Sequence, residues 1–151
     1  MYLKILNEKM NHHGFQYKEG LNIDTVPFNP KGNCEPGGLY YTDKENIFGF
    51  LLFGTLIADV HVPEDAQVYQ SKHKWKADRI VLSNVRPVEE YIKSLSREEK
   101  FRILEHYNNS TVIGFRWDLI RIDETFDNWI KSMRHWLNVQ RMRKLNRTAH
   151  S

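Results

Sequence analysis

Two adjacent histidines, His12 and His13, are the first residues of this chain whose type could support chemistry. Neighbouring residues of a strand point to opposite sides, so the pair is poorly placed to chelate one metal ion. No Asp, Glu or His cluster with the spacing of metal ligands accompanies them, and we predict no metal site. The pair is interpreted as a solvated turn, with the alternative that one of the two, His13, lines a pocket.

The single cysteine, Cys34, lies in a loop that is rich in glycine and proline. A nucleophilic thiol needs a base and electropositive surroundings, and its neighbours Asn33 and Glu35 provide neither. Cys34 is therefore interpreted as structural or incidental. The chain has no P-loop lysine motif, no G-x-G-x-x-G and no G-x-S-x-G, so no motif assigns a reaction.

Two basic stretches are candidates for binding a partner or an anion. The first consists of Lys72, Lys74, Trp75 and Lys76, and it combines positive charge with an aromatic ring, as surfaces for single-stranded nucleic acid do. The second consists of Arg141, Arg143 and Lys144 near the C-terminus. The alternatives are a solvated rim for the first stretch and cations that complement a helix dipole for the second.

The charge of the chain is concentrated in its last segment. The net charge is +3, and residues 124–151 alone carry six basic and two acidic side chains. The other residues are therefore close to neutral. This distribution favours a local anionic contact over a protein built wholly to bind nucleic acid.

The first half of the chain is predicted to be rich in strands. Alternating apolar residues predict strands at residues 2–6, 39–41, 55–62, 66–69 and 77–82, and a hairpin of residues 15–18 with 21–24 around Gly20. Thr42 and Glu45 have the spacing of a capping box, so one helix is expected from Asp43 to about Gly54.

The second half is predicted to be helical. A helix is expected at residues 88–95, and Ser96 with Glu99 forms a second capping box that starts another. Residues 111–123 are ambiguous, because Phe115, Trp117 and Leu119 alternate as in a strand but Ile120 breaks the alternation. A last helix is expected over residues 126–137, followed by a frayed basic tail. The chain of 151 residues thus predicts a single α+β domain, with a β-rich part at 1–85 that holds one inserted helix and a helical part at 86–151.

The location is predicted from what the sequence lacks. One cysteine allows no internal disulfide, and the N-terminus has no apolar run of the signal-peptide kind. The longest apolar segment, residues 47–57, is too short to span a bilayer. We therefore expect a soluble protein that is not secreted and has no membrane partner.

Several spaced motifs resemble one protein family. They are FQYKEGLN at residues 15–22, PFNP at 27–30, CEPGGLYYT at 34–42, VPEDAQV at 62–68 and KWKADRIV at 74–81. These motifs are similar to uncharacterised proteins of giant DNA viruses of the mimivirus kind, including the segment that precedes ankyrin repeats in some of them. The resemblance covers residues 7–83, and no ankyrin signature follows it here. It implies a location in the host cell cytoplasm or in the virion.

The layout of the first half also resembles small ADP-ribosyltransferases. That resemblance implies that His13 and Tyr40 or Tyr41 hold NAD, with Glu64 and Gln67 as candidates for a third, polar residue. Otherwise no cofactor is expected. The leading hypothesis is a non-enzymatic interaction module that binds a host or viral protein, and the alternative is an NAD-binding enzyme of this kind. Binding of nucleic acid through the basic tail is a third hypothesis.

Overall fold

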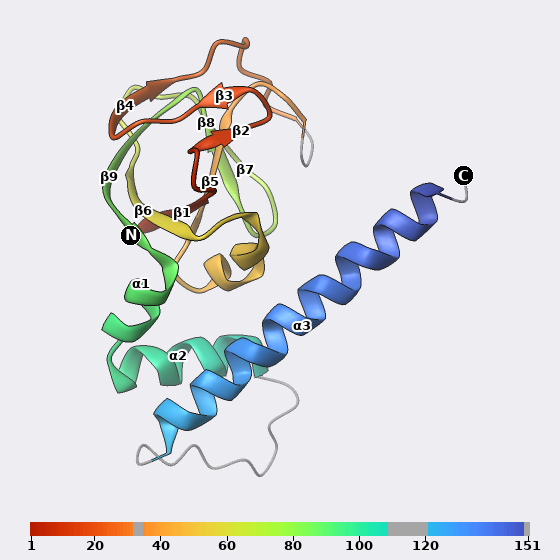
Figure 1. Ribbon diagram of the computed structural model, residues 1–151. Helices are drawn as coiled ribbons and strands as arrows, with labels where there is room; N and C mark the ends of the chain where they lie inside the picture. Colours follow the sequence, from red (N-terminus) through yellow and green to blue (C-terminus); the bar gives the residue numbers. More distant parts are fainter. Residues whose placement is uncertain (32–34, 109–120, 150–151) are drawn as a thin grey trace. The chain divides into compact units, whose positions relative to one another are not determined.

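The computed structural model describes residues 1–31, 35–108 and 121–149. The chain forms two compact units, Met1–Tyr91 and Ile92–Ser151, which are described separately. Strands dominate the first unit and helices the second, so the predicted α+β class is confirmed (Figure 1). Cys34 and most of the ambiguous segment 111–123 lie outside the described residues. The prediction of one domain stays a prediction.

The first unit is built on a seven-stranded antiparallel sheet with the order β4-β9-β6-β1-β5-β8-β7. Its strands are β1 (Tyr2–Leu6), β4 (Gly20–Ile23), β5 (Leu39–Asp43), β6 (Leu56–His61), β7 (Val68–Gln70), β8 (Trp75–Ala77) and β9 (Arg79–Pro87). A separate two-stranded hairpin is made by β2 (Asn11–His12) and β3 (Phe15–Gln16). The helix α1 (Val88–Ser94) follows β9 directly, which confirms the helix expected there.

The large sheet is curled (Figure 1), and Asp78 links two strands that lie far apart in it. This one residue separates β8 from β9 along the chain, although β6, β1 and β5 lie between them in the sheet. The Asp78 N–H donates to the Gln67 carbonyl, and its own carbonyl accepts from the Asp24 N–H. Asp78 therefore ties together the two ends of the sheet, because Asp24 follows edge strand β4 and Gln67 precedes edge strand β7.

Both faces of the central strand β1 are covered. On one face, Leu6 joins a buried cluster that includes Tyr17, Tyr41, Ala58, Val60 and Leu82. On the other face, β1 and β5 contact the 3₁₀ helix η1 (Asn46–Phe53), whose Ile47, Phe48 and Leu51 are buried. Four of the five residues of β1 are buried as a result.

Two glycines shape the loop that precedes β5. Gly37 and Gly38 have φ angles of +95° and +138°, which side-chain-bearing residues rarely adopt. A Cβ on Gly38 would lie 2.7 Å from Cδ of Lys76, and one on Gly37 would lie 2.5 Å from the Pro27 carbonyl oxygen. Gly38 lets the loop pack closely over Lys76, and Gly37 lets it pack closely against Pro27.

The predicted hairpin of residues 15–18 with 21–24 is wrong. β3 pairs with β2 across a turn at His13 and Gly14, whereas β4 pairs with β9. The reason is local: Asn22 Oδ1 accepts from the Lys18 N–H, and Asn22 Nδ2 donates to the carbonyls of Lys18 and Gly20. These bonds stabilise a bend where the hairpin turn was expected, and they leave β4 to a distant strand.

The capping box predicted at Thr42 is also wrong. Thr42 is a buried residue of β5, and its hydroxyl donates to the carbonyl of His73. The helix that follows is the 3₁₀ helix η1, which begins at Asn46, and Asp43 Oδ1 accepts from the Asn46 N–H at 2.9 Å. The strand thus extends through the predicted cap, and the aspartate takes its role.

The second unit contains α2 (Arg97–Asn108) and α3 (Ile122–Ala149), which contact each other. The capping box at Ser96 is confirmed, since the Glu99 N–H donates to Ser96 Oγ and the Ser96 N–H donates to Glu99 Oε1. Phe126 and Ile130 are buried, and Lys100 donates to Asp123 at 2.8 Å. The frayed tail is wrong: α3 continues through the basic residues to Ala149.

Candidate functional site

The structure brings together Tyr40 and two of the lysines that the sequence singled out. We call this the lysine–tyrosine cluster, made up of Lys4, Tyr17, Tyr40, Tyr69, Lys74 and Lys76. Strands β5 and β8 form its centre, because Tyr40 is paired with Lys76 in their register. The ammonium of Lys74 lies 4.6 Å from the centroid of the Tyr40 ring, and that of Lys76 lies 5.6 Å from it.

Lys76 is completely buried at the centre of the cluster. Its Nζ donates to the carbonyl of Lys31 at 3.0 Å and lies 5.9 Å from the centroid of the Tyr69 ring. A buried ammonium needs such partners, because leaving it bare costs several kcal/mol. Lys76 therefore holds the loop before β5 against β8, and its charge faces the inside of the protein.

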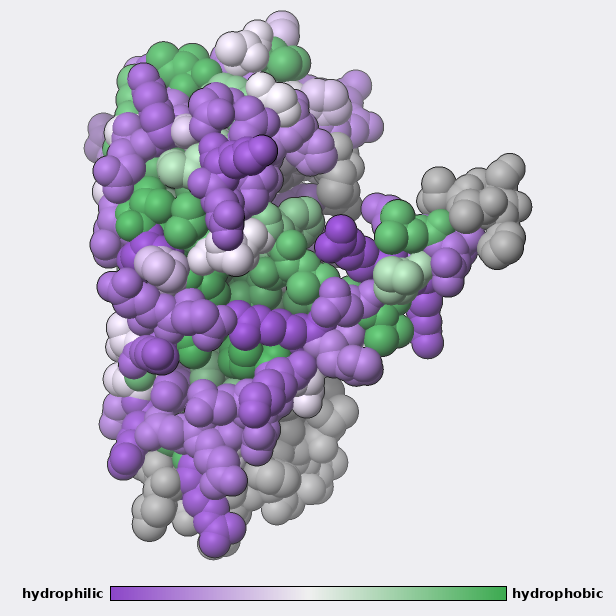
Figure 2. Space-filling model, in the orientation of Figure 1, coloured by the Kyte–Doolittle hydropathy of each residue, from purple (hydrophilic) through white to green (hydrophobic). Residues whose placement is uncertain are grey.

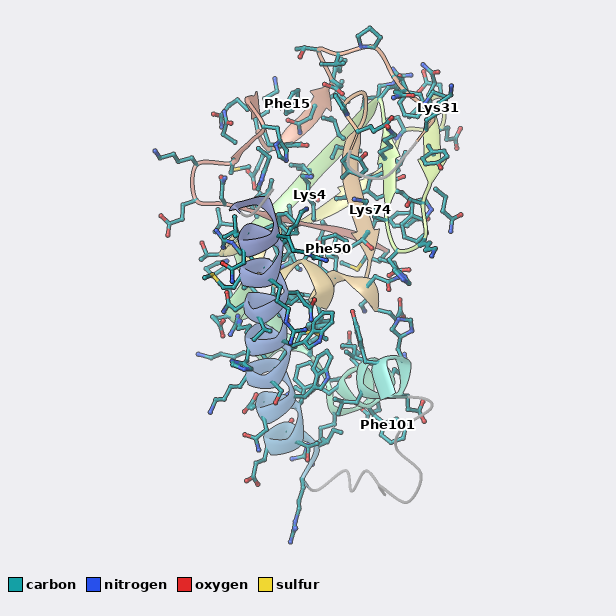
Figure 3. The ribbon with its side chains drawn as sticks, turned by 90° about the vertical axis from the view of Figure 1, so that its right-hand side faces the viewer. Lys4, Phe15, Lys31, Phe50, Lys74 and Phe101 are labelled. Atoms are coloured by element: carbon teal, nitrogen blue, oxygen red, sulfur yellow. The ribbon has the colours of Figure 1, made fainter. Side chains whose placement is uncertain are left out.

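Lys4 is the second buried lysine of the cluster. Its Nζ donates to the carbonyl of Tyr40 at 2.6 Å and lies 4.6 Å from the centroid of the Tyr17 ring. Burial first, and then the positive charge of Lys74, lowers the pKa of Lys4 to about 7. Figure 3 shows Lys4 and Lys74 in the same part of the sheet unit.

The chemistry that Lys4 could perform follows from these contacts. An amine that is partly neutral at pH 7 can act as a nucleophile or a base. Among the described residues, however, no carboxylate pairs with Lys4 or Lys76, and their ammonium groups are taken up by carbonyls and rings. The geometry favours a structural role in which each lysine joins two segments of the chain.

The remaining residues of the first basic stretch have different places. Lys72 and His73 are exposed at the tip of the β7–β8 turn, which the Ser71 N–H closes by donating to the Lys74 carbonyl at 2.8 Å. Trp75 is half-buried against Tyr2 and Tyr41, with ring centroids 5.3 and 6.3 Å apart. Only Lys72 and part of Lys74 face solvent, and their role in binding an anion stays a prediction.

The residues expected to hold NAD do not lie together on one face of the sheet. Tyr40 and Tyr41 are neighbours in β5, so their side chains point to opposite faces of the sheet. Tyr41 is in the buried cluster, where burial raises its pKa to about 12, whereas His13 is exposed in the β2–β3 turn with a φ of 53°. Glu64 and Gln67 are exposed. This arrangement does not support the ADP-ribosyltransferase interpretation.

His12 is half-buried, whereas His13 is exposed, but the His12 ring already takes part in a hydrogen bond. Its Nε2 accepts a hydrogen bond from the Asn7 N–H at 3.2 Å. Burial, followed by the charges of Lys4 and His13, lowers the pKa of His12 to about 4. Neutral His12 thus fixes the start of the β2–β3 hairpin, which is a structural role for this residue.

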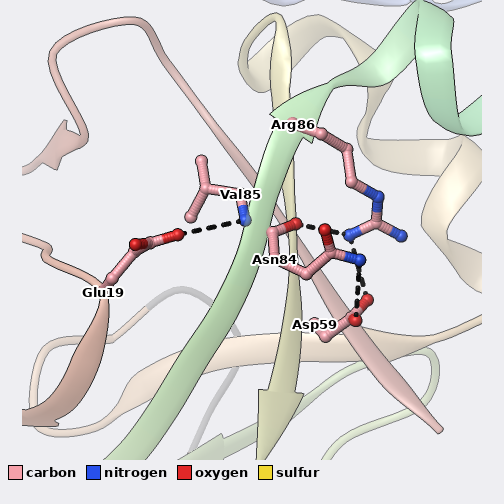
Figure 4. Close-up of polar contacts among 5 residues, drawn as sticks. All are labelled: Glu19, Asp59, Asn84, Val85 and Arg86. Carbon is pink, nitrogen blue, oxygen red and sulfur yellow. Dashed lines mark hydrogen bonds and ion pairs between the residues drawn. The ribbon is translucent and has the colours of Figure 1, made fainter.

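A polar network that the sequence did not reveal lies where β6 meets β9 (Figure 4). Two residues of β9, Asn84 and Val85, stand opposite one residue of β6, and Asn84 has a φ of 52°. This is a β-bulge, a feature that is common beside functional sites. No alternation pattern could have located it, since the extra residue only shifts the register.

The side chains around the bulge satisfy one another. Asp59 accepts from Arg86 Nη1 at 3.0 Å and from Asn84 Nδ2 at 3.3 Å, and Arg86 Nη1 also donates to the Asn84 carbonyl. Glu19 Oε1 accepts from the Val85 N–H at 3.3 Å (Figure 4). Both oxygens of Asp59 are occupied, so this network fixes the bulge and offers no free base.

Strand β4 is an edge of the large sheet, since it pairs with β9 and with no other described strand. The Asp24 N–H donates to the Asp78 carbonyl, so Asp24 and, by alternation, Asn22 turn their backbone groups toward β9. The N–H and C=O groups of Leu21 and Ile23 therefore point away from the sheet. The side chains of these two residues are 45% and 59% exposed.

Figure 2 shows hydrophobic side chains at the surface at the upper left, where Figure 1 places β4. Val26, just after the strand, is also exposed. The sequence predicted the strand at 21–24 but paired it with residues 15–18 and not with β9. Its free edge was therefore not predicted. We call this surface the β4 edge, formed by Leu21, Ile23 and Val26.

Residues 1–31, 35–108 and 121–149 contain no group of three or more His, Cys, Asp or Glu side chains that could hold a metal ion. None of the helices described is long and apolar enough to cross a membrane.

Comparison with known proteins shows that the chain is related to proteins of Acanthamoeba polyphaga mimivirus. Two of these relatives are each named a putative ankyrin repeat protein. One is 39% identical over 82 residues, which are 48% of this chain and 27% of that protein. The other is 40% identical over 89 residues, 54% of this chain and 44% of its own length. An uncharacterised mimivirus protein is 46% identical over 67 residues, 43% of this chain and 49% of its own length.

These matches confirm the resemblance to giant-virus proteins that the motifs of the first half predicted. The chain matches less than half of the length of each of these three relatives. No family model matches the chain, and no solved structure matches it.

Proposed function

We propose that this chain is a non-enzymatic protein-interaction module that binds an extended segment of a partner protein along the β4 edge. The observation that carries the proposal is the outward direction of the backbone groups of Leu21 and Ile23 beside two exposed apolar side chains. Main-chain hydrogen bonds to such an edge provide affinity, and side-chain contacts provide specificity.

The free edge also defines the kind of partner. A strand that pairs with β4 meets apolar side chains on one face only, because Asn22 is buried on the other. The partner segment should therefore have apolar residues at alternate positions. An unprotected edge of this kind is a risk for aggregation, and proteins usually block it with charge, a bulge or a covering segment. An apolar edge left open is consistent with a surface used for binding.

The relatives support a role in protein interaction. Two of them are named as ankyrin repeat proteins, and stacked repeats of this type form extended binding surfaces. We propose that the segment shared with these relatives also contacts a partner protein in this chain. We propose that the partner is a host or viral protein and that the module acts in the infected host cell, in its cytoplasm or in the virion.

The test is a selection from a library of extended ten-residue peptides, followed by titration of the enriched peptides by calorimetry. The expected peptides have alternating apolar residues. Ile23→Lys should weaken their binding at least tenfold, because a charge replaces the apolar contact. Val68→Lys is the matched control, since Val68 is a similarly exposed residue of the other edge strand, β7. Equal losses in both variants, or no enriched peptide, would contradict the proposal.

A second variant tests the main-chain contact by itself. Ile23→Pro removes an N–H that points away from the sheet, and proline is tolerated on edge strands at such positions. The variant should keep the circular dichroism spectrum of the wild type and lose peptide binding. Retained binding would show that the backbone of β4 is not the contact.

A further inference from the structure

The helix α3 changes its apolar side along its length. In its first half, Phe126, Ile130 and Leu137 share one side, where Phe126 and Ile130 are buried. With Ile122 set at 0° and a turn of about 100° per residue, these three residues lie between about 40° and 80°. Further along the helix the same side carries Lys144, at about 40°. The buried stripe of the second unit therefore ends at Leu137.

A second apolar side begins where the first ends. Val139, Met142 and Leu145 lie at about 260°, 200° and 140°, which is the other side of the helix from the buried stripe. Met142 is 56% exposed and Leu145 is 55% exposed, whereas Val139 is half-buried. Since the three residues are spaced i, i+3 and i+6, they form a row about 9 Å long. We call it the outer row of α3.

Arginines flank the outer row on both sides. Arg143 lies about 40° beyond Val139, and Arg141 lies about 40° beyond Leu145. Every residue from 141 to 147 is exposed, and residues 128–147 contain six basic side chains and no Asp or Glu. The surface thus has an apolar centre between two positive margins. Its complement is a surface with an apolar centre between two acidic margins.

The first half of α3 argues against a flat anionic membrane as that complement. Glu124 and Asp127 lie at about 200° and 140°, on the same side of the helix as the outer row. Both carboxylates are exposed. Because α3 is one continuous rod (Figure 1), a flat surface along its outer side would meet them as well. Anionic lipid repels such charges, whereas a groove about two turns long contacts residues 139–145 alone.

A second copy of this chain is also a poor partner. Two outer rows packed antiparallel would bring Arg141 and Arg143 of both copies to the margins of one interface. Like charges at the margins of a helix pair disfavour its formation. The outer row therefore requires a partner of opposite charge.

We propose that the outer row and its flanking arginines dock into an apolar groove with acidic margins on a partner protein. In this mode an amphipathic helix lays its apolar side into a groove, and the charged margins fix its orientation. The sequence predicted Arg141 and Arg143 as partner-binding residues from their charge, and the outer row supplies the apolar part of the contact. The inference is independent of the β4 edge, which lies in the other unit of the chain.

The test starts from a displayed library of host and viral protein domains, selected for binding to the full chain, and each enriched domain is titrated by calorimetry. We expect an acidic domain whose affinity falls at least tenfold with Met142→Gln, because glutamine keeps the helix and removes the apolar contact. Trp136→Gln is the matched control, since Trp136 is also 56% exposed but lies about 120° away around the helix. Equal losses in the two variants, or no enriched acidic domain, would overturn the proposal.

A second pair of variants tests the positive margins. R141E/R143E should weaken binding at least tenfold, because carboxylates would then face the acidic margins. K9E/K18E reverses the same number of charges at exposed lysines of the first unit, and it should keep the wild-type affinity. Circular dichroism checks that both variants retain their helices. An equal loss in K9E/K18E would reduce the effect to net charge and contradict docking through the margins.

The other occupants are tested with the chain alone. We expect a monomer in sedimentation equilibrium and only weak binding to vesicles of phosphatidylserine and phosphatidylcholine. A dimer that Met142→Gln dissociates would assign the outer row to a second copy. Binding to the vesicles that is tighter than to any enriched domain, and that Met142→Gln abolishes, would assign it to membranes. Either result would overturn the protein groove.

Discussion

The two basic stretches of this chain are alike in composition and opposite in environment. Residues 72–76 belong to a turn and strand β8, where Lys76 is buried beneath the loop that precedes β5 and Lys72 is exposed at the tip of the turn. Residues 141–147 belong to a helix that exposes every one of them. Positive charge in a sequence therefore predicts an anion site only when the element that carries it is known.

The difference also separates two environments of basic side chains. In the lysine–tyrosine cluster, the ammonium groups of Lys4 and Lys76 donate to the carbonyls of Tyr40 and Lys31 and hold segments together. In α3, the side chains of Arg141 and Arg143 are exposed to solvent. Substitution of Lys4 or Lys76 should therefore change the stability of the protein, whereas substitution of Arg141 or Arg143 should change it little.

The largest expected effect on stability comes from Lys76→Ala. The substitution removes a fully buried stem and leaves the Lys31 carbonyl without its donor. We expect the free energy of unfolding to fall by about 4 kcal/mol in urea denaturation, from the cavity and the lost bond together. Lys72→Ala, at the exposed tip of the same stretch, should change it by less than about 0.5 kcal/mol. Similar values for both would remove the distinction between buried and exposed lysines.

The next effect is a pH dependence caused by Lys4. Its pKa is about 7 in the folded chain and 10.5 without the fold, so above pH 7 the unfolded chain binds more protons. Stability from this group therefore rises with pH, by about 3 kcal/mol between pH 7 and 9.5. Lys4→Met should abolish the rise, whereas Lys9→Met, at an exposed site, should keep it.

This pH window isolates Lys4. His12 titrates below it, since its pKa falls from 6.5 to about 4 on folding. Burial raises the pKa values of Tyr17 and Tyr41, so their contributions begin only as the tyrosines of the unfolded chain ionise near pH 10. A wild-type profile that is flat from pH 7 to 9.5 would mean that Lys4 keeps its proton when buried.

A smaller effect is expected from Gly38→Ala. The new Cβ would lie 2.7 Å from Cδ of Lys76, and a φ of +138° is unfavourable for alanine. We expect a loss of about 2 kcal/mol in the free energy of unfolding. Gly14→Ala is the control, because Gly14 has a φ of +82° but no atom within 4 Å of its Cβ position. If the two variants lose equally, backbone strain alone explains the loss, and contact with Lys76 does not.

The elements with regular patterns could be predicted from the sequence. Strands β1, β5 and β6 and the buried stripe of α3 that includes Phe126 and Ile130 were found from alternation and helical spacing. The burial of Lys4 was not, because alternation assumes one wet face, and β1 is covered on both. Its environment depends on Tyr17 and on the carbonyl of Tyr40 in β5, which are distant from Lys4 in the sequence.

The β4 edge was missed for a related reason. Strand pairing over long sequence distances is not encoded by local turn residues, and Gly20 suggested a hairpin that Asn22 prevents through its bonds to Lys18. The free edge exists only because β4 pairs with β9 and with no other strand among the described residues. The pattern of residues 21–23 shows a strand, but only the sheet order shows which side of it is open.

The smallest expected effect comes from the two capping-box patterns, which repeat the lesson of the two basic stretches. At Ser96 and Glu99 both reciprocal bonds form, whereas Thr42 is buried in β5 and Asp43 caps η1 instead. Ser96→Ala should therefore lower the free energy of unfolding by about 1 kcal/mol and reduce the helical circular dichroism signal near the transition. Ser96→Asp, which keeps an acceptor at the cap, should restore the wild-type value. If Ser96→Asp is as unstable as Ser96→Ala, the hydroxyl does not act as a cap, and Ser96 contributes through some other contact.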